Sequence, residues 1–126
     1  MNMVLAIALG GGLGAVGRYA VGAGALALMG PGFPFGTLAA NVVGGFLMGA
    51  VVEAGALKFS YSPELRAFLT VGLLGGFTTF SAFSLESALM IQRGEWALAF
   101  GYVAMSALFS IGALFCGLWL MRGVLS

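Results

Sequence analysis

Four apolar stretches, each long enough to cross a lipid bilayer, constrain this chain more than any other feature of its sequence. They cover about residues 3–29, 35–57, 64–90 and 96–121. A transmembrane helix needs about 20 predominantly apolar residues. The breaks between the stretches are short and contain glycine, proline or charged residues. The sequence therefore predicts an all-α membrane protein, with four transmembrane helices and antiparallel neighbours, in one domain over residues 1–126.

Composition agrees with a lipid environment and makes several functions improbable. The chain is 61% hydrophobic and only 7% charged, whereas a soluble domain is about one quarter charged. The net charge of +1 gives no basic face for a phosphate backbone, so no nucleic-acid partner is expected. The chain contains no histidine, and its four acidic residues are dispersed, so we do not expect an enzyme.

Charged residues near the ends of the stretches only weakly predict how the chain is oriented in the membrane. Lys58, Arg66 and Arg122 are expected on the side of the two termini, and Arg93 on the other side. The number of Lys and Arg residues in short loops sets the orientation of a membrane protein. A small imbalance suggests the hypothesis that the chain inserts in both orientations.

Small residues recur at intervals of four in the first two stretches. Gly10 and Gly14 form one such pair, Gly45 and Gly49 another, and Gly36, Ala40 and Gly44 extend the pattern. Small residues on one helical face let two backbones approach closely, and this packing drives much of helix association in lipid. These stripes are expected to be packing seams.

A few polar residues lie within the first two apolar stretches, where they are costly and often functional. Arg18 either pairs structurally or helps to attract an anion. Thr37 and Asn41 are one helical turn apart and share a face. Their hydroxyl and amide donors could bind an anion, or they could join neighbouring helices by hydrogen bonds.

The fourth stretch carries hydroxyl groups at regular spacing. Tyr102, Ser106 and Ser110 follow one another at intervals of four, which places them on one slowly drifting stripe of a helix. A single serine often bonds to its own helix backbone. Three aligned hydroxyls are better explained as a pore lining or a contact seam.

The third stretch has the strongest local signal, in residues 72–84. Gly75 and Gly76 precede two β-branched threonines, Thr78 and Thr79. Glycine and threonine both have low helix propensity. We expect the helix to break near the membrane midplane, where freed carbonyl groups need protein, water or an ion. A simple kink is the alternative.

Two phenylalanines follow the expected break. Phe80 and Phe83 are three residues apart and share a helical face. They could pack against lipid. A phenyl ring also has a positive edge, so two rings beside a narrow path could meet an anion without trapping it.

Three motifs together resemble the CrcB/Fluc family of fluoride exporters. They are Gly-Gly-Leu-Gly-Ala-Val-Gly-Arg-Tyr at 11–19, Gly-Thr-Leu-Ala-Ala-Asn at 36–41 and Gly-Gly-Phe-Thr-Thr-Phe-Ser-Ala-Phe at 75–83. The resemblance covers the whole chain in length, layout and order of motifs. It implies a fluoride channel that exports fluoride passively across the cytoplasmic (inner) membrane, as an antiparallel dual-topology homodimer.

The resemblance also implies site residues. The carbonyl groups of Gly75 and Thr78, from both subunits, would hold a structural sodium ion (Na+) at the dimer centre. The implied fluoride pore includes the following residues: Asn41, Phe80, Phe83, Thr37, Ser81, Tyr102, Ser106, Ser110 and Glu86.

The main alternative is a small proton-coupled multidrug exporter, which can also have four helices and an antiparallel dimer. Such a protein needs a carboxylate midway along the first helix to exchange protons and cations. This chain has Arg18 in that region instead.

Overall fold

The computed structural model describes residues 2–126, so Met1 of the predicted domain 1–126 lies outside the described residues. The described chain is all helical and has four segments long and apolar enough to cross a membrane, which confirms the predicted fold class at this level. The elements are, in order, α1 (Met3–Met29), α2 (Phe35–Leu57), α3 (Pro63–Ala67), the π-helix η1 (Phe68–Leu74), α4 (Gly75–Phe77), α5 (Ser81–Gln92) and α6 (Trp96–Leu125).

Local sequence sets the ends of these helices. The Asn2 side chain accepts a hydrogen bond of 2.8 Å from the Leu5 N–H and caps α1. α1 ends at Gly30, whose φ of 78° is the left-handed conformation that glycine adopts most easily. Ser62 caps α3 in the same way, with Pro63 in the first turn.

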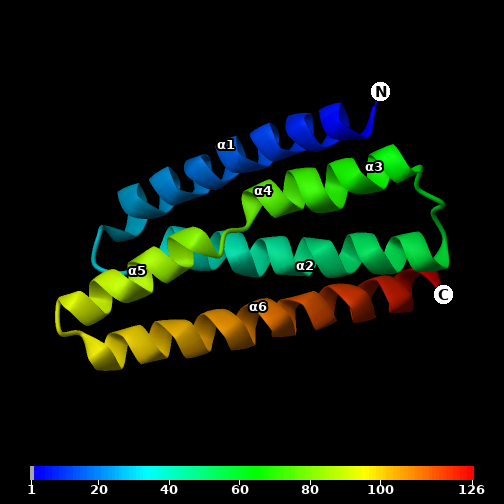
Figure 1. Cartoon of the computed structure of the whole chain (residues 1–126). Coiled ribbons are helices and arrows are strands. Elements are labelled where there is room, and N and C mark those ends of the chain that lie inside the picture. Colours follow the sequence, from blue (N-terminus) through cyan, green and yellow to red (C-terminus); the bar gives the residue numbers. More distant parts are fainter. Residues whose placement is uncertain (1) are drawn as a thin grey trace.

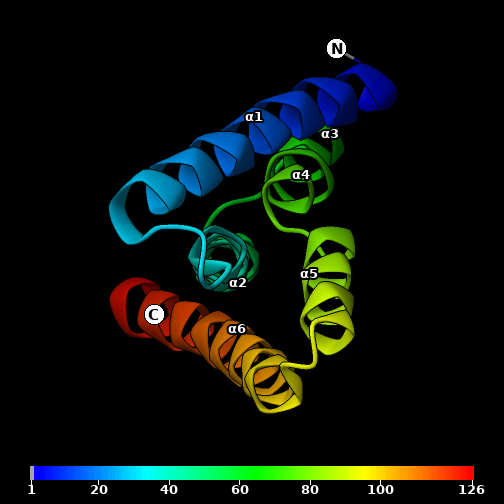
Figure 2. The same ribbon diagram turned by 90° about the vertical axis from the view of Figure 1, so that its left-hand side faces the viewer.

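The four segments run side by side, with α2 at the centre (Figures 1 and 2). α1 and α6 lie on different sides of α2, and the run from α3 to α5 forms the fourth segment. Both termini and the α2–α3 loop lie at one end of the bundle, while the α1–α2 and α5–α6 loops lie at the other. An ion pair of 3.0 Å between Arg122 and Glu53 joins α6 to α2 near the first of these ends.

The predicted glycine seams are packing contacts in the structure. A Cβ atom added to Gly10 would lie 2.6 Å from the Phe68 carbonyl oxygen, so α1 touches the backbone of η1 there. A Cβ atom on Gly45 would lie 2.8 Å from the Ser110 carbonyl oxygen of α6. Real Cβ atoms do not approach backbone this closely, so side chains at these positions would separate the helices.

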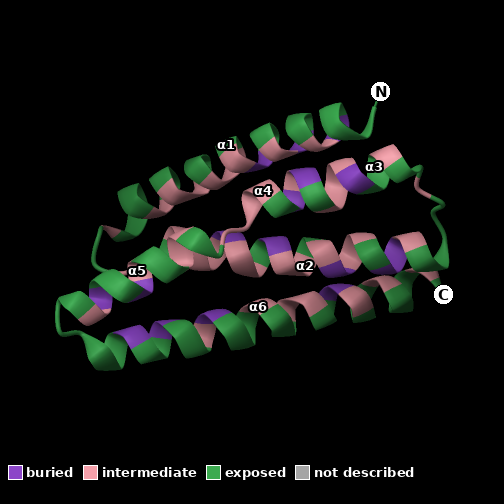
Figure 3. Cartoon of the chain, viewed as in Figure 1, coloured by how far each residue is buried: buried purple, intermediate pink, exposed green. Residues whose placement is uncertain are grey.

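All helices of the bundle have exposed residues (Figure 3), and many of the exposed side chains are large and apolar. Large side chains such as Val4, Leu28 and Leu108 are 70% or more exposed. A soluble monomer rarely shows such continuous apolar surface, so these faces require lipid or another protein.

The third segment changes its backbone twice. The wider turns of η1 follow α3, and π-helical turns often occur at functional sites. α4 ends at Phe77, Thr78 is extended with a φ of −83° and a ψ of 160°, and α5 begins at Ser81. We refer to residues 78–80 as the α4–α5 junction. Its expected position near the membrane midplane stays a prediction.

Candidate functional site

The α4–α5 junction is held by the side chain of Asn41 on α2. The Asn41 Nδ2 atom donates to the Thr79 carbonyl at 3.0 Å, and the Asn41 Oδ1 atom accepts from the Thr79 N–H at 2.7 Å. The amide therefore pairs with both backbone groups of one residue, as a neighbouring strand would. Its second N–H remains for another acceptor. Asn41 thus bonds between helices, and its predicted role in a pore stays a prediction.

The four carbonyl groups of residues 75–78 lose their usual helical donors at the junction, and for two of them the donor bonds to a side chain instead. In a continuous helix, the Gly75 carbonyl would accept from the Thr79 N–H and the Thr78 carbonyl from the Ala82 N–H. The Thr79 N–H donates to Asn41 instead, and the Ala82 N–H donates to the Thr79 hydroxyl at 3.1 Å. These two carbonyl groups are those assigned to sodium from the family resemblance.

Arg18 contacts the same region from α1. Its Nε–H donates to the Gly76 carbonyl at 3.2 Å, and the side chain is partly buried. The guanidinium therefore satisfies a third carbonyl group near the junction and ties α1 to α4. This is the structural pairing considered from the sequence, while a part in attracting an anion stays a prediction.

The two phenylalanines after the junction differ in their surroundings. Phe83 is partly buried, and its ring centroid lies 5.2 Å from that of Tyr102 on α6. Phe80 lies 5.6 Å from Phe83 but is 79% exposed. Gly75 and Ser81 are exposed as well. Part of the predicted site therefore lies inside the subunit and part on its outer surface.

A carboxylate joins three helices beside Phe83. The Thr37 hydroxyl on α2 donates to Glu86 Oε2 at 2.9 Å, and the Tyr102 hydroxyl on α6 donates to Glu86 Oε1 at 3.0 Å. Tyr102 is fully buried. We call Thr37, Glu86 and Tyr102 the carboxylate cluster. The structure thus brings together three residues that are far apart in the sequence.

Two further hydroxyls continue the stripe of Tyr102 along α6. The Oγ atoms of Ser106 and Ser110 are buried and have no hydrogen-bond partner among residues 2–126. A buried polar atom without a partner is unfavourable by about 1 to 3 kcal/mol, so such atoms call for an explanation. By contrast, the hydroxyls of Ser84 and Ser87 donate to carbonyl groups four residues earlier in the chain, those of Phe80 and Phe83.

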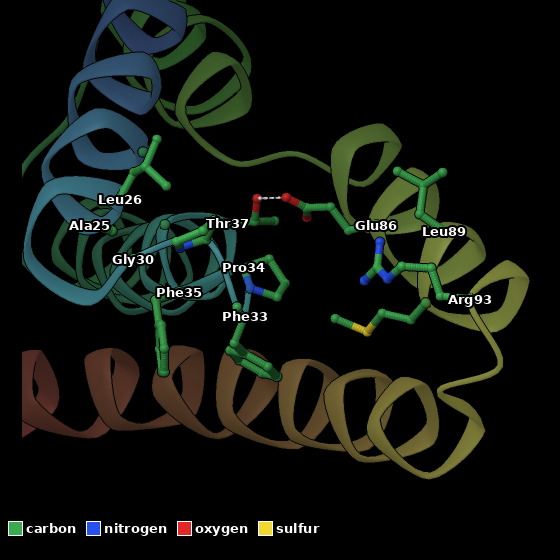
Figure 4. A pocket seen from close by; sticks show the side chains of 15 residues that line it. Ala25, Leu26, Gly30, Phe33, Pro34, Phe35, Thr37, Glu86, Leu89 and Arg93 are labelled. Carbon is green, nitrogen blue, oxygen red and sulfur yellow. Dashed lines mark hydrogen bonds between the residues drawn. The ribbon is translucent and has the colours of Figure 1, made fainter.

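A cavity of about 320 Å³ adjoins the carboxylate cluster at the end of the bundle that contains the α1–α2 loop. Thr37 and Glu86 line one part of it, residues 30–36 form another, and Arg93 at the end of α5 lines it too (Figure 4).

Sequence reasoning did not select two residues that the structure places in this region. Thr79 binds Asn41 and caps Ala82, but its neighbour Thr78 looks equivalent in sequence. The sequence shows Arg93 only as a loop charge, although the residue lines the cavity beside Glu86. Neither residue carries a sequence signal that would reveal these contacts.

Comparison with known proteins decides the family. The model of the family described as "CrcB-like protein, Camphor Resistance (CrcB)" matches residues 5–118. The chain belongs to the CrcB family. This confirms the family resemblance seen in the three motifs.

CrcB relatives match this chain over nearly its whole length. One from Rhodospirillum centenum is 53% identical over 122 residues, 97% of both chains. One from Caulobacter vibrioides is 54% identical over 125 residues, 98% of both chains. One from Rhizobium etli is 51% identical over 124 residues, 98% of this chain and 99% of the relative. All three are named "Fluoride-specific ion channel FluC".

These CrcB relatives and the four apolar helices together identify a multi-pass membrane protein. Ion channels are not a class of enzyme, and the comparisons do not favour the multidrug exporter considered from the sequence. The individual pore and sodium residues of this chain stay predictions.

Proposed function

We propose that this CrcB protein is a fluoride-selective channel that exports fluoride passively across the cytoplasmic (inner) membrane. The observation that carries the proposal is the pair of buried hydroxyls without partners, Ser106 and Ser110, in line with Tyr102 and the carboxylate cluster. Donors without acceptors suit the passage of a small anion. The names of relatives that are about half identical support fluoride as that anion.

The energetics explain why an anion path needs such donors. Moving an ion of carboxylate size into a medium of low dielectric constant is unfavourable by an idealised 20 kcal/mol or so. A hydrogen bond to a charged group returns about 1.5 to 3 kcal/mol. Several hydroxyls along α6 therefore lower the barrier in steps, and no single position holds the ion too tightly to release it.

Selectivity over chloride follows from the size of the ion. A compact anion makes shorter and stronger hydrogen bonds with fixed hydroxyls than a larger one does. The positive edges of the Phe80 and Phe83 rings would narrow the path without adding a full charge.

A second copy of the chain would complete the site. Phe80, Ser81 and Gly75 lie exposed on the outer surface of one subunit, which an inverted partner would cover in an antiparallel homodimer. Arg93 pairs with Glu95, and Arg122 pairs with Glu53. These pairs do not change the count of Lys and Arg, and the small imbalance of that count between the two ends is compatible with insertion in both orientations.

The junction also fits a structural sodium ion. The carbonyl groups of Gly75 and Thr78 lose their helical donors to side chains, and carbonyl oxygens are the ligands that hard cations prefer. These two groups would hold Na+ at the subunit interface. A bound cation would supply a fixed positive charge beside the path. Asn41 and Arg18 keep the surrounding backbone in place.

The direct test is fluoride efflux from liposomes that contain the purified protein, followed with a fluoride electrode. We expect rapid efflux of fluoride and far slower efflux of chloride under the same gradient. A protein that releases fluoride no faster than empty liposomes, although correctly inserted, is not a fluoride channel.

A further inference from the structure

The carboxylate cluster contains an anion that belongs to the protein itself. Both oxygens of Glu86 accept hydrogen bonds, one from Thr37 and one from Tyr102. A hydroxyl group has one proton and donates to one acceptor at a time. The two hydroxyls therefore cannot serve Glu86 and a passing anion simultaneously. Any anion that uses these donors must first displace the carboxylate.

The cavity beside the cluster offers the carboxylate room to move. Its volume of about 320 Å³ compares with the ~30 Å³ that one water molecule occupies in the liquid. Glu86 lines this cavity, and Figure 4 shows its side chain extending from α5 toward Thr37, with open space on the side of Arg93. A change of Glu86 rotamer would move the carboxylate from the hydroxyls into the cavity.

Arg93 is placed to receive it. Arg93 caps the C-terminal end of α5, seven residues after Glu86. Seven residues are about two helical turns along one face, with an axial rise of about 10 Å. Its Nε atom bonds to Glu95 at 2.7 Å in an exposed ion pair, and exposed pairs are weak. In the described part of the chain, no hydrogen bond involves the two terminal nitrogens of Arg93. A second carboxylate can bind there.

We propose that Glu86 is a displaceable anion that fluoride must replace on Thr37 and Tyr102, while the carboxylate turns toward Arg93. The inference rests on the proposed channel function and assigns Glu86 and Arg93 a part in selectivity. With no ion in the path, the carboxylate keeps the two hydroxyls bonded. A compact anion competes well for them, whereas chloride forms weaker hydrogen bonds and competes poorly.

The test compares wild type, Glu86→Gln, Arg93→Gln and the double variant in liposomes. The fluoride concentration at half-maximal flux and the ratio of chloride to fluoride flux are measured. Glu86→Gln removes the competing charge, so the half-maximal fluoride concentration should fall and the ratio of chloride to fluoride flux should rise. Each change should be about fivefold or more, because fivefold is the lower end of the coupling usually found between two sites. Arg93→Gln should raise the half-maximal concentration. Glu64→Gln, a change to an acidic residue outside the site, is the matched control.

The double variant separates this role from simple attraction of the ion. If Arg93 acts by receiving the carboxylate, Arg93→Gln has no further effect once Glu86 is glutamine. Equal effects of Arg93→Gln in both backgrounds would overturn the proposal, as would a Glu86→Gln protein that is folded but carries less fluoride than wild type. Arg93 is half exposed, so its variant should fold even if that of Glu86 does not.

Failure of the two proposals can be told apart. Absence of fluoride flux in the wild type would reject the channel function and this inference with it. A conducting wild type whose half-maximal concentration and chloride ratio are unchanged by both single substitutions would reject only the displaceable carboxylate.

Discussion

Replacing Asn41 tests the contact that holds the α4–α5 junction. In Asn41→Leu both backbone groups of Thr79 lose their partner. An unpaired buried polar group is unfavourable by about 1 to 3 kcal/mol, so two such groups amount to about 2 to 6 kcal/mol. Thr79 is only partly buried, and a water molecule that reached it would bring the loss toward the lower limit.

Asn41→Asp removes one of the two contacts between Asn41 and Thr79 and keeps the other. A carboxylate can still accept from the Thr79 N–H, but it cannot donate to the Thr79 carbonyl. One contact of the two is lost, so the destabilisation should be about half, or 1 to 3 kcal/mol. The carboxylate would also repel an anion in a nearby path. We therefore expect Asn41→Asp to fold better than Asn41→Leu and yet to conduct poorly.

The assay has two readings. Thermal aggregation of detergent-solubilised protein gives the order of stability, which should be wild type, then aspartate, then leucine. Fluoride efflux from liposomes should be strongly reduced in both variants. Val43→Leu, on the exposed part of the same helix, is the control and should resemble wild type. If both Asn41 variants melt and conduct as wild type does, the contact between Asn41 and Thr79 does not hold the junction.

Three further substitutions test other parts of the structure. Ser110→Ala removes a buried hydroxyl that has no hydrogen-bond partner. Thermal stability should therefore stay equal or rise while fluoride efflux falls. Lower stability with unchanged efflux would contradict this expectation. Phe80→Ile and Phe83→Ile should each abolish fluoride efflux while the protein still elutes as a folded species, and unchanged flux in both would remove the rings from the path. Gly45→Ala places a methyl group against the Ser110 carbonyl and should lower stability by about 1 to 3 kcal/mol in a melting assay, whereas Gly101→Ala, with open space around it, should not.

The sequence alone predicted the four apolar helices because the length of a bilayer sets the length of the segments that cross it. It also placed the glycine seams, since positions four apart share a helical face whatever the partner helix is. The family followed from the motifs around Arg18, Asn41 and Phe80, which the comparison confirms.

The partners of the polar residues needed the tertiary structure. Thr37 and Glu86 are 49 positions apart, and Glu86 and Tyr102 are 16 apart. Helical periodicity shows which residues share a face of one helix, but it does not show which faces meet. The carboxylate cluster and its cavity therefore could not be derived from spacing.

The two possibilities for Asn41 illustrate the same limit. Sequence showed an amide that could either bind an anion or join two helices. Only the folded chain brings the backbone of Thr79 within 2.7 to 3.0 Å of that amide. The composition of a helix determines which hydrogen-bond donors it carries. The neighbouring helix provides the acceptor, and which acceptor lies within reach depends on how closely the glycine seams let the two backbones approach.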